Sequence, residues 1–308
     1  MEINNTIVNR TKPQIQVVKK PECTYQEPVD CYQPSCSGSF ESSQMGKKLA
    51  KLVYDKSVNE LYAPCQREIQ AKGFDSIISN SNITQDEKDI AGLGVKFGTH
   101  LDDIKDSSVA KARNEVLSAL INPCGGSIGQ VIAKVTYDAG VKTQYASEQR
   151  TVQQDGLEAI VSNSKTSEDE KALAQLGIKF GTHDIDIGDV NVTRARNVIL
   201  KVLSNPVSDP ISIVIQKVID KIEIGPATAD GRTVTKDCLE VVISNPDTSE
   251  ELKSLARHKI EESDLIQKRW NDLMGVDEEK KQWEATLRMR DQLLATGRWA
   301  TAGGKDID

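Results

Sequence analysis

The segment 125–129 has residue types and a spacing that could carry nucleophilic chemistry. It reads G-x-S-x-G, the motif in which a strand leads into a sharp turn that presents a serine, here Ser127, as a nucleophile. In this chain the segment follows an apolar helical run that ends at Asn122, and a duplicated copy of the segment has Pro210 in place of the serine. A flexible helix entry is therefore the plainer interpretation. Helix N-termini attract negative charge, so a candidate anion site remains at the backbone of Gly125, Gly126 and Ser127.

Two histidines, His100 and His183, occupy equivalent positions in the duplicated sequence Lys-Phe-Gly-Thr-His. A shared metal ion would require them to lie together, yet a four-helix unit separates them, which is roughly 20 Å at helix spacings of about 8–10 Å. Metal–ligand bonds are only about 2 Å long, so one ion cannot bridge the two rings. A histidine that follows a helix C-terminus is also favoured by the helix dipole. We therefore predict a structural role for both.

Three of the six cysteines, Cys23, Cys31 and Cys36, lie near the start of the chain. Zinc sites usually contain a close C-x-x-C pair, whereas these cysteines are separated by seven and four intervening residues and have no histidine nearby. Reduced thiols are the expectation, and the sequence predicts neither a metal site nor a cofactor. Cys238 replaces a glycine of the earlier copies, which predicts a small residue where helices approach closely.

A shift of 83 positions superimposes long stretches of the sequence on one another. Residues 45–55 fall on 128–138, residues 96–100 on 179–183, and residues 112–114 on 195–197. A shorter period lies within this duplication, because successive apolar runs end at intervals of 42, 41, 42 and 40 residues, at Asn80, Asn122, Asn163, Asn205 and Asn245. Proline follows three of these asparagines and stops the helix. The elementary module is therefore about 41 residues, a length typical of a pair of packed helices.

Capping signals predict where the helices of each module begin and end. Thr84, Ser167 and Thr248 each open an S/T-x-x-E sequence, the capping box in which a hydroxyl and a glutamate satisfy amides at a helix start. Gly98 and Gly181 fall where helices should end, and we expect them to adopt the left-handed C-cap conformation. Apolar residues recur with the 3.6-residue period of a helix, and no segment alternates like a strand. The predicted helices are 44–57, 60–79, 84–98, 108–121, 127–142, 145–162, 167–181, 191–204, 209–223, 232–244 and 249–274, with a further helix after 277.

These modules predict an all-α fold, an α-solenoid of about five two-helix repeats in which each hairpin buries its apolar side against its neighbours. The repeat domain is expected to cover residues 43–263. Residues 1–42, rich in proline and polar side chains, are predicted to form a disordered tail. Residues 264–308 hold all three tryptophans and are predicted to form a helical extension that caps the array, followed by a short tail.

Aromatic and arginine residues recur at the same offset in the first two copies. Tyrosine and arginine often dominate binding surfaces, although packing between repeats would also explain their recurrence. The tryptophans of the C-terminal extension are flanked by basic residues, so the extension could form a docking or self-association surface as well as a cap. The candidate partner-binding residues are Tyr54, Tyr62, Arg67, Tyr137, Tyr145, Arg150, Trp270 and Trp283.

The charge balance of the chain narrows the classes of partner. A net charge of −7 and a pI near 5.3 argue against a nucleic-acid-binding protein, which usually presents a basic face. No run of 18 apolar residues occurs, and the first residues lack the charged and then apolar order of a secretory signal. We therefore expect a cytoplasmic protein that contacts neither nucleic acid nor membrane.

Helix pairs of about 41 residues that end at asparagine and reopen at serine, threonine or proline resemble HEAT and armadillo-type α-helical repeats over residues 43–263. The resemblance implies a curved scaffold that binds proteins or peptides, and it brings no catalytic residue with it. We therefore predict a non-enzymatic scaffold for a protein or peptide partner, of open oligomeric state. The alternative is a HEAT-like enzyme or a small-ligand or anion-binding protein that uses the glycine-rich loop 124–129, with Ser127 or Cys124 as its reactive group.

Overall fold

The computed structural model describes residues 40–60, 62–100, 105–123, 125–142, 146–183, 187–205, 209–222, 224 and 228–295. Within these ranges the fold is all-α, with twelve helices and no strand. The helices are α1 (Gln44–Val58), α2 (Ala63–Ser79), α3 (Gln85–Phe97), α4 (Asp106–Ile121), α5 (Ile128–Val141), α6 (Ala146–Ser162), α7 (Glu168–Phe180), α8 (Asp189–Leu203), α9 (Ile211–Lys221), α10 (Ala229–Ser244), α11 (Glu250–Met274) and α12 (Val276–Ala295). None of the helices in this part of the chain has both the length and the apolar composition that crossing a bilayer requires.

The predicted helices are all present, and their ends lie within three residues of the predicted ones. Complete capping boxes start α3 and α7, formed by Thr84 with Glu87 and by Ser167 with Glu170. The third predicted box is wrong, because Ser249 and not Thr248 is the N-cap of α11, which puts Leu252 at the third helical position.

Gly98 and Gly181 follow α3 and α7 as predicted, but the predicted reason for glycine is wrong. Their φ angles are −87° and −78°, in the right-handed region that any residue adopts. Glycine makes room for a side chain from another helix, because a Cβ atom at either position would lie 2.0 Å from a guanidinium nitrogen, that of Arg113 on α4 or of Arg196 on α8, and would displace it. A contact from another helix therefore selects glycine here, and the local backbone does not.

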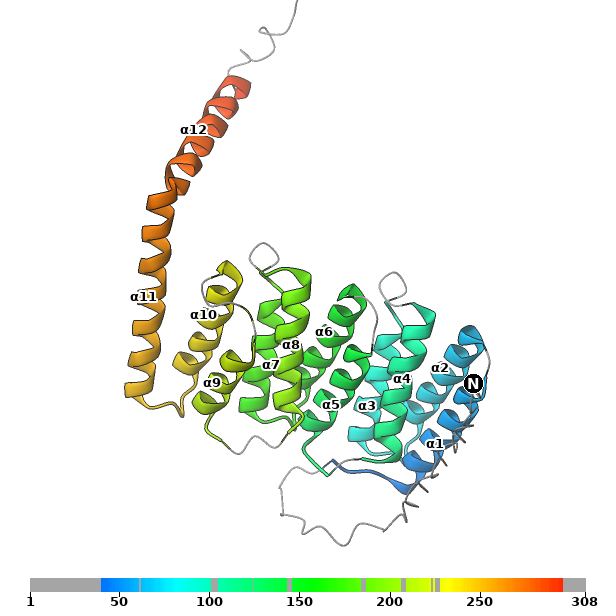
Figure 1. Ribbon diagram of the computed structural model, residues 1–308. Coiled ribbons are helices and arrows are strands. Elements are labelled where there is room, and N and C mark those ends of the chain that lie inside the picture. Colours follow the sequence, from blue (N-terminus) through cyan, green and yellow to red (C-terminus); the bar gives the residue numbers. More distant parts are fainter. Residues whose placement is uncertain are drawn as a thin grey trace, which may run out of the picture. The chain divides into compact units, whose positions relative to one another are not determined.

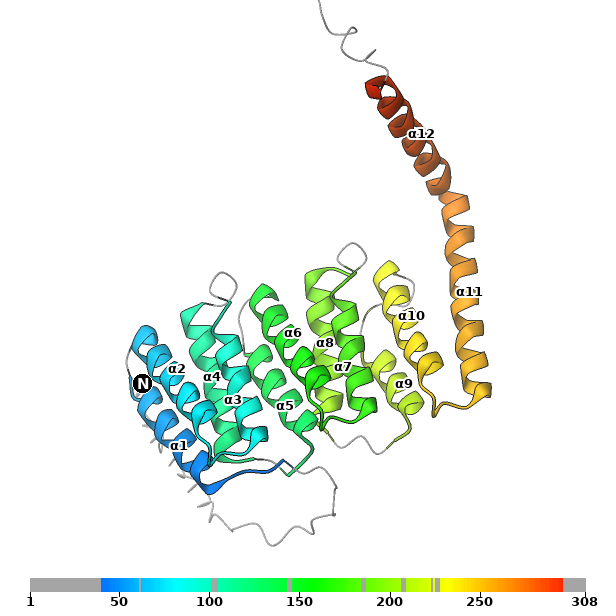
Figure 2. The ribbon, with the colours of Figure 1, turned by 180° about the vertical axis from the view of Figure 1, so that it is seen from behind.

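Helices α1 to α11 pack in two layers (Figure 1 and Figure 2). In the first layer α1, α4, α5, α8 and α9 are successive neighbours, and in the second layer α2, α3, α6, α7, α10 and α11 are. The hairpins α1–α2 and α3–α4 therefore enter the layers in opposite order, and an equivalent arrangement returns only after four helices. We call α1–α4 the first unit, α5–α8 the second unit and α9–α11 the third unit. This alternation explains why the sequence repeats more closely after 83 residues than after 41.

A continuous apolar core runs between the layers from Ala50 in α1 to Ala256 in α11. Equivalent residues fill it in successive units, since Phe97 and Phe180 are both completely buried at an 83-residue spacing. Burying one large apolar side chain stabilises a fold by about 1.5–3 kcal/mol. The stability of the array is therefore distributed over the contacts between neighbouring helices.

Close helix packing occurs at the position predicted from Cys238. A Cβ atom at Gly73 would lie 2.4 Å from the side chain of Val53, and one at Gly156 would lie 1.9 Å from that of Thr136. In the third unit Cys238 is completely buried. Burial, assisted by the charge of Asp237, raises the pKa of its thiol well above the ordinary value, which keeps the sulfur protonated.

Both ends of the array differ from the predicted domain boundaries. Phe40 packs against the core and the amide of Glu41 donates to Asp86 at 3.1 Å, so residues 40–42 belong to the folded unit and not to the tail. The rest of the predicted tail, residues 1–39, lies outside the described residues. At the other end α11 is one helix of 25 residues, and the predicted boundary between residues 263 and 264 falls inside it. It ends at Gly275, whose φ of 69° is left-handed, and α12 follows at once.

Candidate functional site

Two groups of charged side chains, which we call the junction clusters, lie where one unit meets the next in the second layer. In the first cluster Lys96 Nζ, near the end of α3, lies 3.2 Å from Asp155 Oδ1 and 2.7 Å from Glu158 Oε2, both on α6. His100 Nε2 shares a 2.9 Å hydrogen bond with Asp155 Oδ2. One buried carboxylate, Asp155, therefore holds two side chains of the preceding unit.

The second junction cluster repeats this arrangement between α7 and α10. Lys179 Nζ lies 2.9 Å from Asp237 Oδ1 and also pairs with Glu240. His183 Nε2 lies 2.9 Å from Asp237 Oδ2, close enough for an ion pair, although the angle is poor for a hydrogen bond. His100 and His183, which the sequence predicts to be equivalent, thus each contact an aspartate of the following unit. This contact acts on each ring in addition to the dipole of the preceding helix.

Burial and pairing shift the pKa values in the first junction cluster. Burial raises the pKa of Asp155, and the nearby Lys96 and His100 oppose this shift only in part. Burial by itself lowers the pKa of Lys96, but its hydrogen bonds and charge interactions with Glu158 and Asp155 outweigh that effect, so the pKa is raised. The hydrogen bond from Lys96 lowers the pKa of Glu158. Lys96 therefore remains charged at neutral pH and bound to both carboxylates.

The distribution of these residues along the chain indicates that the clusters join units together. In α2, which follows no earlier unit in the described part of the chain, Lys72 stands at the position of Asp155. In α11, Leu265 stands at the position of His183. Each cluster lines an open hollow of about 500 Å³. Within each cluster the charged side chains pair with one another, which favours a role in connecting two units over a role in catalysis.

Ser127, the candidate nucleophile, is the N-cap of α5. Its hydroxyl accepts a hydrogen bond from the amide of Gln130 and donates to the carboxylate of Glu170 on α7. The amide of Ser127 donates to Gln130 Oε1 at 3.1 Å. The amides of Ser127 and Gln130 at this helix start are therefore engaged, and the neighbouring Glu170 carboxylate would repel an anion. Cys124, the other candidate reactive group, lies outside the described residues.

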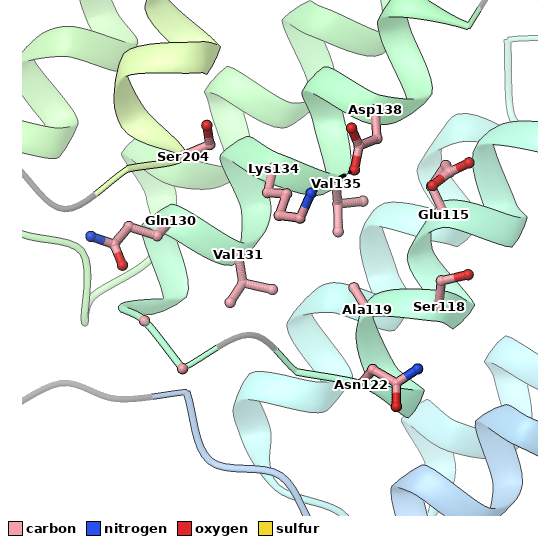
Figure 3. Close-up of a pocket in the computed structure, with 12 residues that line it drawn as sticks. Glu115, Ser118, Ala119, Asn122, Gln130, Val131, Lys134, Val135, Asp138 and Ser204 are labelled. Carbon is pink, nitrogen blue, oxygen red and sulfur yellow. Dashed lines mark hydrogen bonds and ion pairs between the residues drawn. The ribbon is translucent and has the colours of Figure 1, made fainter. Parts of the chain in front are cut away.

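A cavity of about 270 Å³ lies beside this loop, between α4 and α5 in the first layer. Val131 and Val135 of α5 face Ala119 of α4 across it (Figure 3). Polar groups surround the opening, and two of them, Lys134 and Asp138, form an ion pair at 3.0 Å. The full lining is Glu115, Ser118, Ala119, Asn122, Gly125, Gly126, Gln130, Val131, Lys134, Val135, Asp138 and Ser204.

The candidate tyrosines and arginines of the first two units differ in exposure. Tyr54 and Tyr137 are half-buried and pack against the core. Arg67 pairs with Asp106 on α4, and Arg150 pairs with Asp189 on α8, so both arginines connect helices within a unit. These four contacts agree with packing as the reason for their recurrence. Of the remaining two candidates, Tyr62 is 70% exposed and Tyr145 lies outside the described residues.

The two candidate tryptophans lie on a strongly exposed surface. Trp270 on α11 is 55% exposed and Trp283 on α12 is 64% exposed. Large apolar neighbours on the same two helices are also half exposed or more. We use the name C-terminal apolar face for these exposed side chains of α11 and α12 taken together, which are Leu265, Ile266, Trp270, Leu273, Met274, Trp283 and Met289.

The aspartates of the junction clusters were absent from the sequence-based candidates. A signal for them exists, because Asp155-Gly156-Leu157-Glu158 recurs as Asp237-Cys238-Leu239-Glu240. The spacing of this recurrence is 82, one residue less than the 83 of the histidine segment, so a search with one fixed period separates the partners.

No group of three or more histidine, cysteine, aspartate or glutamate side chains in the described ranges is arranged to hold a metal ion. Comparison of the chain with protein-family models, with curated proteins and with solved structures finds no match.

Proposed function

We propose that this protein is a non-enzymatic scaffold, an α-solenoid of about five HEAT-like helix pairs that binds a protein partner through the C-terminal apolar face. The observation that carries the proposal is the exposure of Trp270 and Trp283 together with five large apolar neighbours on α11 and α12. Single exposed apolar residues are common, but clusters of them on one surface mark sites of protein interaction.

The C-terminal apolar face contains the residue types that are common in protein–protein interfaces. Tryptophan and methionine are enriched at protein–protein contacts, and tryptophan is prominent among residues whose truncation costs the most binding energy. Lys268 and Arg269, which precede Trp270, are exposed and add positive charge beside the apolar residues. The tryptophans could therefore supply most of the binding energy, and the neighbouring charges could limit non-specific association.

The remaining polar sites favour binding over catalysis. Ser127 caps a helix, the histidines of the junction clusters contact aspartates, and the arginines at 67 and 150 connect helices. A nucleophile, a base and an oxyanion site converging on one pocket would favour an enzyme. The cavity beside Ser127 is lined by no histidine and by no cysteine among the described residues.

Site-specific photo-crosslinking tests this function. A photoreactive residue placed at Leu273, which is 79% exposed, should form adducts with a partner in an extract of the source cells. The same residue at Ile213, 47% exposed on α9, is the matched control and should form far fewer adducts. The double variant Trp270→Ala/Trp283→Ala should abolish the Leu273 adducts while leaving helix content unchanged. Equal adduct yields at 273 and 213, or adducts that survive the double variant, would contradict the proposal.

A second candidate function, binding of a small ligand, is favoured by one observation. The cavity between α4 and α5 has an apolar floor and includes Gly125 and Gly126 of the glycine-rich loop. A small apolar molecule with one hydrogen-bonding group fits such a site in size and chemistry. The variant Ala119→Leu fills the cavity, so a compound that raises the melting temperature of the wild type but not of this variant would support the second function.

A further inference from the structure

Among the described residues, no helix covers the outer side of α1 in the way that α4 covers α5 and α8 covers α9. Four positions spaced three or four residues apart share one side of the first helix of each unit. In α5 these are Ile128, Val131, Val135 and Ala139, and in α9 with its C-cap they are Ile211, Val214, Val218 and Ile222. All eight side chains are at most 5% exposed. In α1 the same positions are Met45, Lys48, Leu52 and Lys56, which we call the α1 outer face, and all four are exposed.

The internal copies show what kind of object covers this side of the helix. In the first layer α4 packs against α5, and α8 packs against α9. Val131 and Val135 meet Ser118 and Ala119 of α4 at the lining of the cavity in Figure 3. The cover in the internal copy is therefore a single helix that presents small residues, Ser118 and Ala119, to the two valines.

The α1 outer face keeps part of this interface and changes the rest. Met45 and Leu52 are 47% and 65% exposed and remain large and apolar. Lys48 and Lys56 replace Val131 and Ala139 of the internal copy. The change adds two positive charges beside two apolar contacts.

The side of α9 that faces solvent shows a different substitution pattern from the α1 outer face. Ala50 and Ala133 are completely buried in the first two units, and Tyr54 and Tyr137 pack against the core. The equivalents in α9 are Gln216 and Asp220, both exposed. No described helix packs beside α9 as α4 packs beside α1 and α8 beside α5. There the apolar residues of both positions were replaced, whereas the α1 outer face retains Met45 and Leu52.

We propose that the α1 outer face docks one amphipathic helix of a partner protein, with acidic residues placed to meet Lys48 and Lys56 and small or apolar residues placed to meet Met45 and Leu52. Four lysines and one aspartate occur in α1, and Lys51 pairs with that aspartate, Asp55, at 2.8 Å. The surface is therefore basic, which matches an acidic helix. Pairing of two α1 outer faces with each other is disfavoured, because their lysines would repel.

Two helical peptides built on residues 105–122, the α4 segment, test this proposal on the full chain. The first has the native sequence, and the second carries Lys111→Glu and Ser118→Glu, which add carboxylates to the side that meets the first helix of a unit. The acidic peptide should bind the wild type at least tenfold more tightly than the native peptide. The variant Lys48→Val/Lys56→Ala restores the residues of α5 and should reverse that preference. Leu52→Glu should abolish binding of both peptides.

Three outcomes would overturn the proposal. The first is that neither peptide binds the full chain. The second is binding that Leu52→Glu leaves unchanged, because the peptides would then act elsewhere, for instance by displacing α4 itself. The third is a concentration-dependent doubling of the molar mass that Leu52→Glu abolishes, which would make a second copy of this chain the occupant. The proposal is independent of the C-terminal apolar face, so Trp270→Ala/Trp283→Ala should leave peptide binding unchanged.

Discussion

Asp155 and Lys96 belong to different units, and their contact across the junction is reproduced by Asp237 and Lys179. The Nζ–Oδ1 distances are 3.2 Å and 2.9 Å. In both places the aspartate is almost completely buried, at 4% and 5% side-chain exposure, while the lysine is about 40% exposed. Each buried aspartate therefore binds a more exposed lysine of the preceding unit.

The substitution Asp155→Asn should change how stability depends on pH. Burial raises the pKa of Asp155 above its ordinary value of 3.8, so in the window just above pH 3.8 the folded chain binds more protons at this site than the unfolded chain does. Its contribution to stability therefore decreases as pH rises through that window. Relative to Asp155→Asn, the wild type should lose stability with rising pH in urea unfolding experiments.

Glu158→Gln is the matched control, with the opposite sign. The hydrogen bond from Lys96 lowers the pKa of Glu158, so this group stabilises the fold above its ordinary value of 4.5 and the contribution is lost as pH falls. The wild type should therefore gain stability relative to Glu158→Gln as pH rises. Parallel trends for the two variants would contradict this account of the first junction cluster.

Two glycines of α3 should respond in opposite directions to substitution by alanine. A Cβ atom at Gly94 would lie 2.6 Å from the ring of the buried Phe74, whereas one at Gly92 would meet open space. Gly94→Ala should cost about 1–3 kcal/mol through overpacking. Gly92→Ala should stabilise the helix by about 0.5–1 kcal/mol. Urea unfolding of the two variants gives both values, and a Gly94→Ala variant at least as stable as the wild type would show that the α2–α3 contact is looser than described.

Removing α12 should leave the rest of the array folded. In the described residues α12 contacts α11, and none of the α12 side chains whose burial is described lies in the buried core. A chain truncated after Val276 should melt within about 2 °C of the full chain, since one kcal/mol corresponds to roughly 2–4 °C in a domain of this size. A much larger decrease, measured by circular dichroism, would mean that α12 supports the core.

Cys65 and Cys238 should differ sharply in reactivity. Cys65 is exposed, whereas Cys238 is completely buried with a pKa raised by burial. Two variants are compared, each of which retains Cys65 or Cys238 as its single cysteine. A disulfide reagent at pH 8 should modify Cys65 about a hundredfold faster than Cys238, because Cys238 reacts only after local opening. In denaturant the two rates should become similar. Fast modification of Cys238 in the folded chain would argue against tight packing of α10.

The helix boundaries could be predicted because their signals are local. Asn-Pro sequences stop helices and capping boxes start them within three or four residues, so Asn122, Thr84 and Ser167 identify their own structural roles. The order of the layers could not be predicted in this way. The apolar stripe of a helix shows which side is buried but does not show in which layer the helix lies. The first helix of the second hairpin could lie in either layer, and only the tertiary contacts distinguish the two arrangements.

The junction clusters and the reason for Gly98 depend on contacts between distant residues. Lys96 and Asp155 are 59 positions apart, and the guanidinium that excludes a side chain at Gly98 belongs to Arg113 on another helix. Recurrence showed that His100 and His183 are equivalent but did not identify what each one contacts. Side-chain partners from another unit are visible only once the stacking of the units is known.

The alternating order of the hairpins restricts how such a chain could change its length during evolution. Deleting one hairpin of about 41 residues would move every later helix to the opposite layer. Polar residues that now face solvent would then face the interior. Deleting 83 residues would preserve the layer of each remaining helix. Recombination within this gene should therefore be tolerated in steps of four helices and rejected in steps of two.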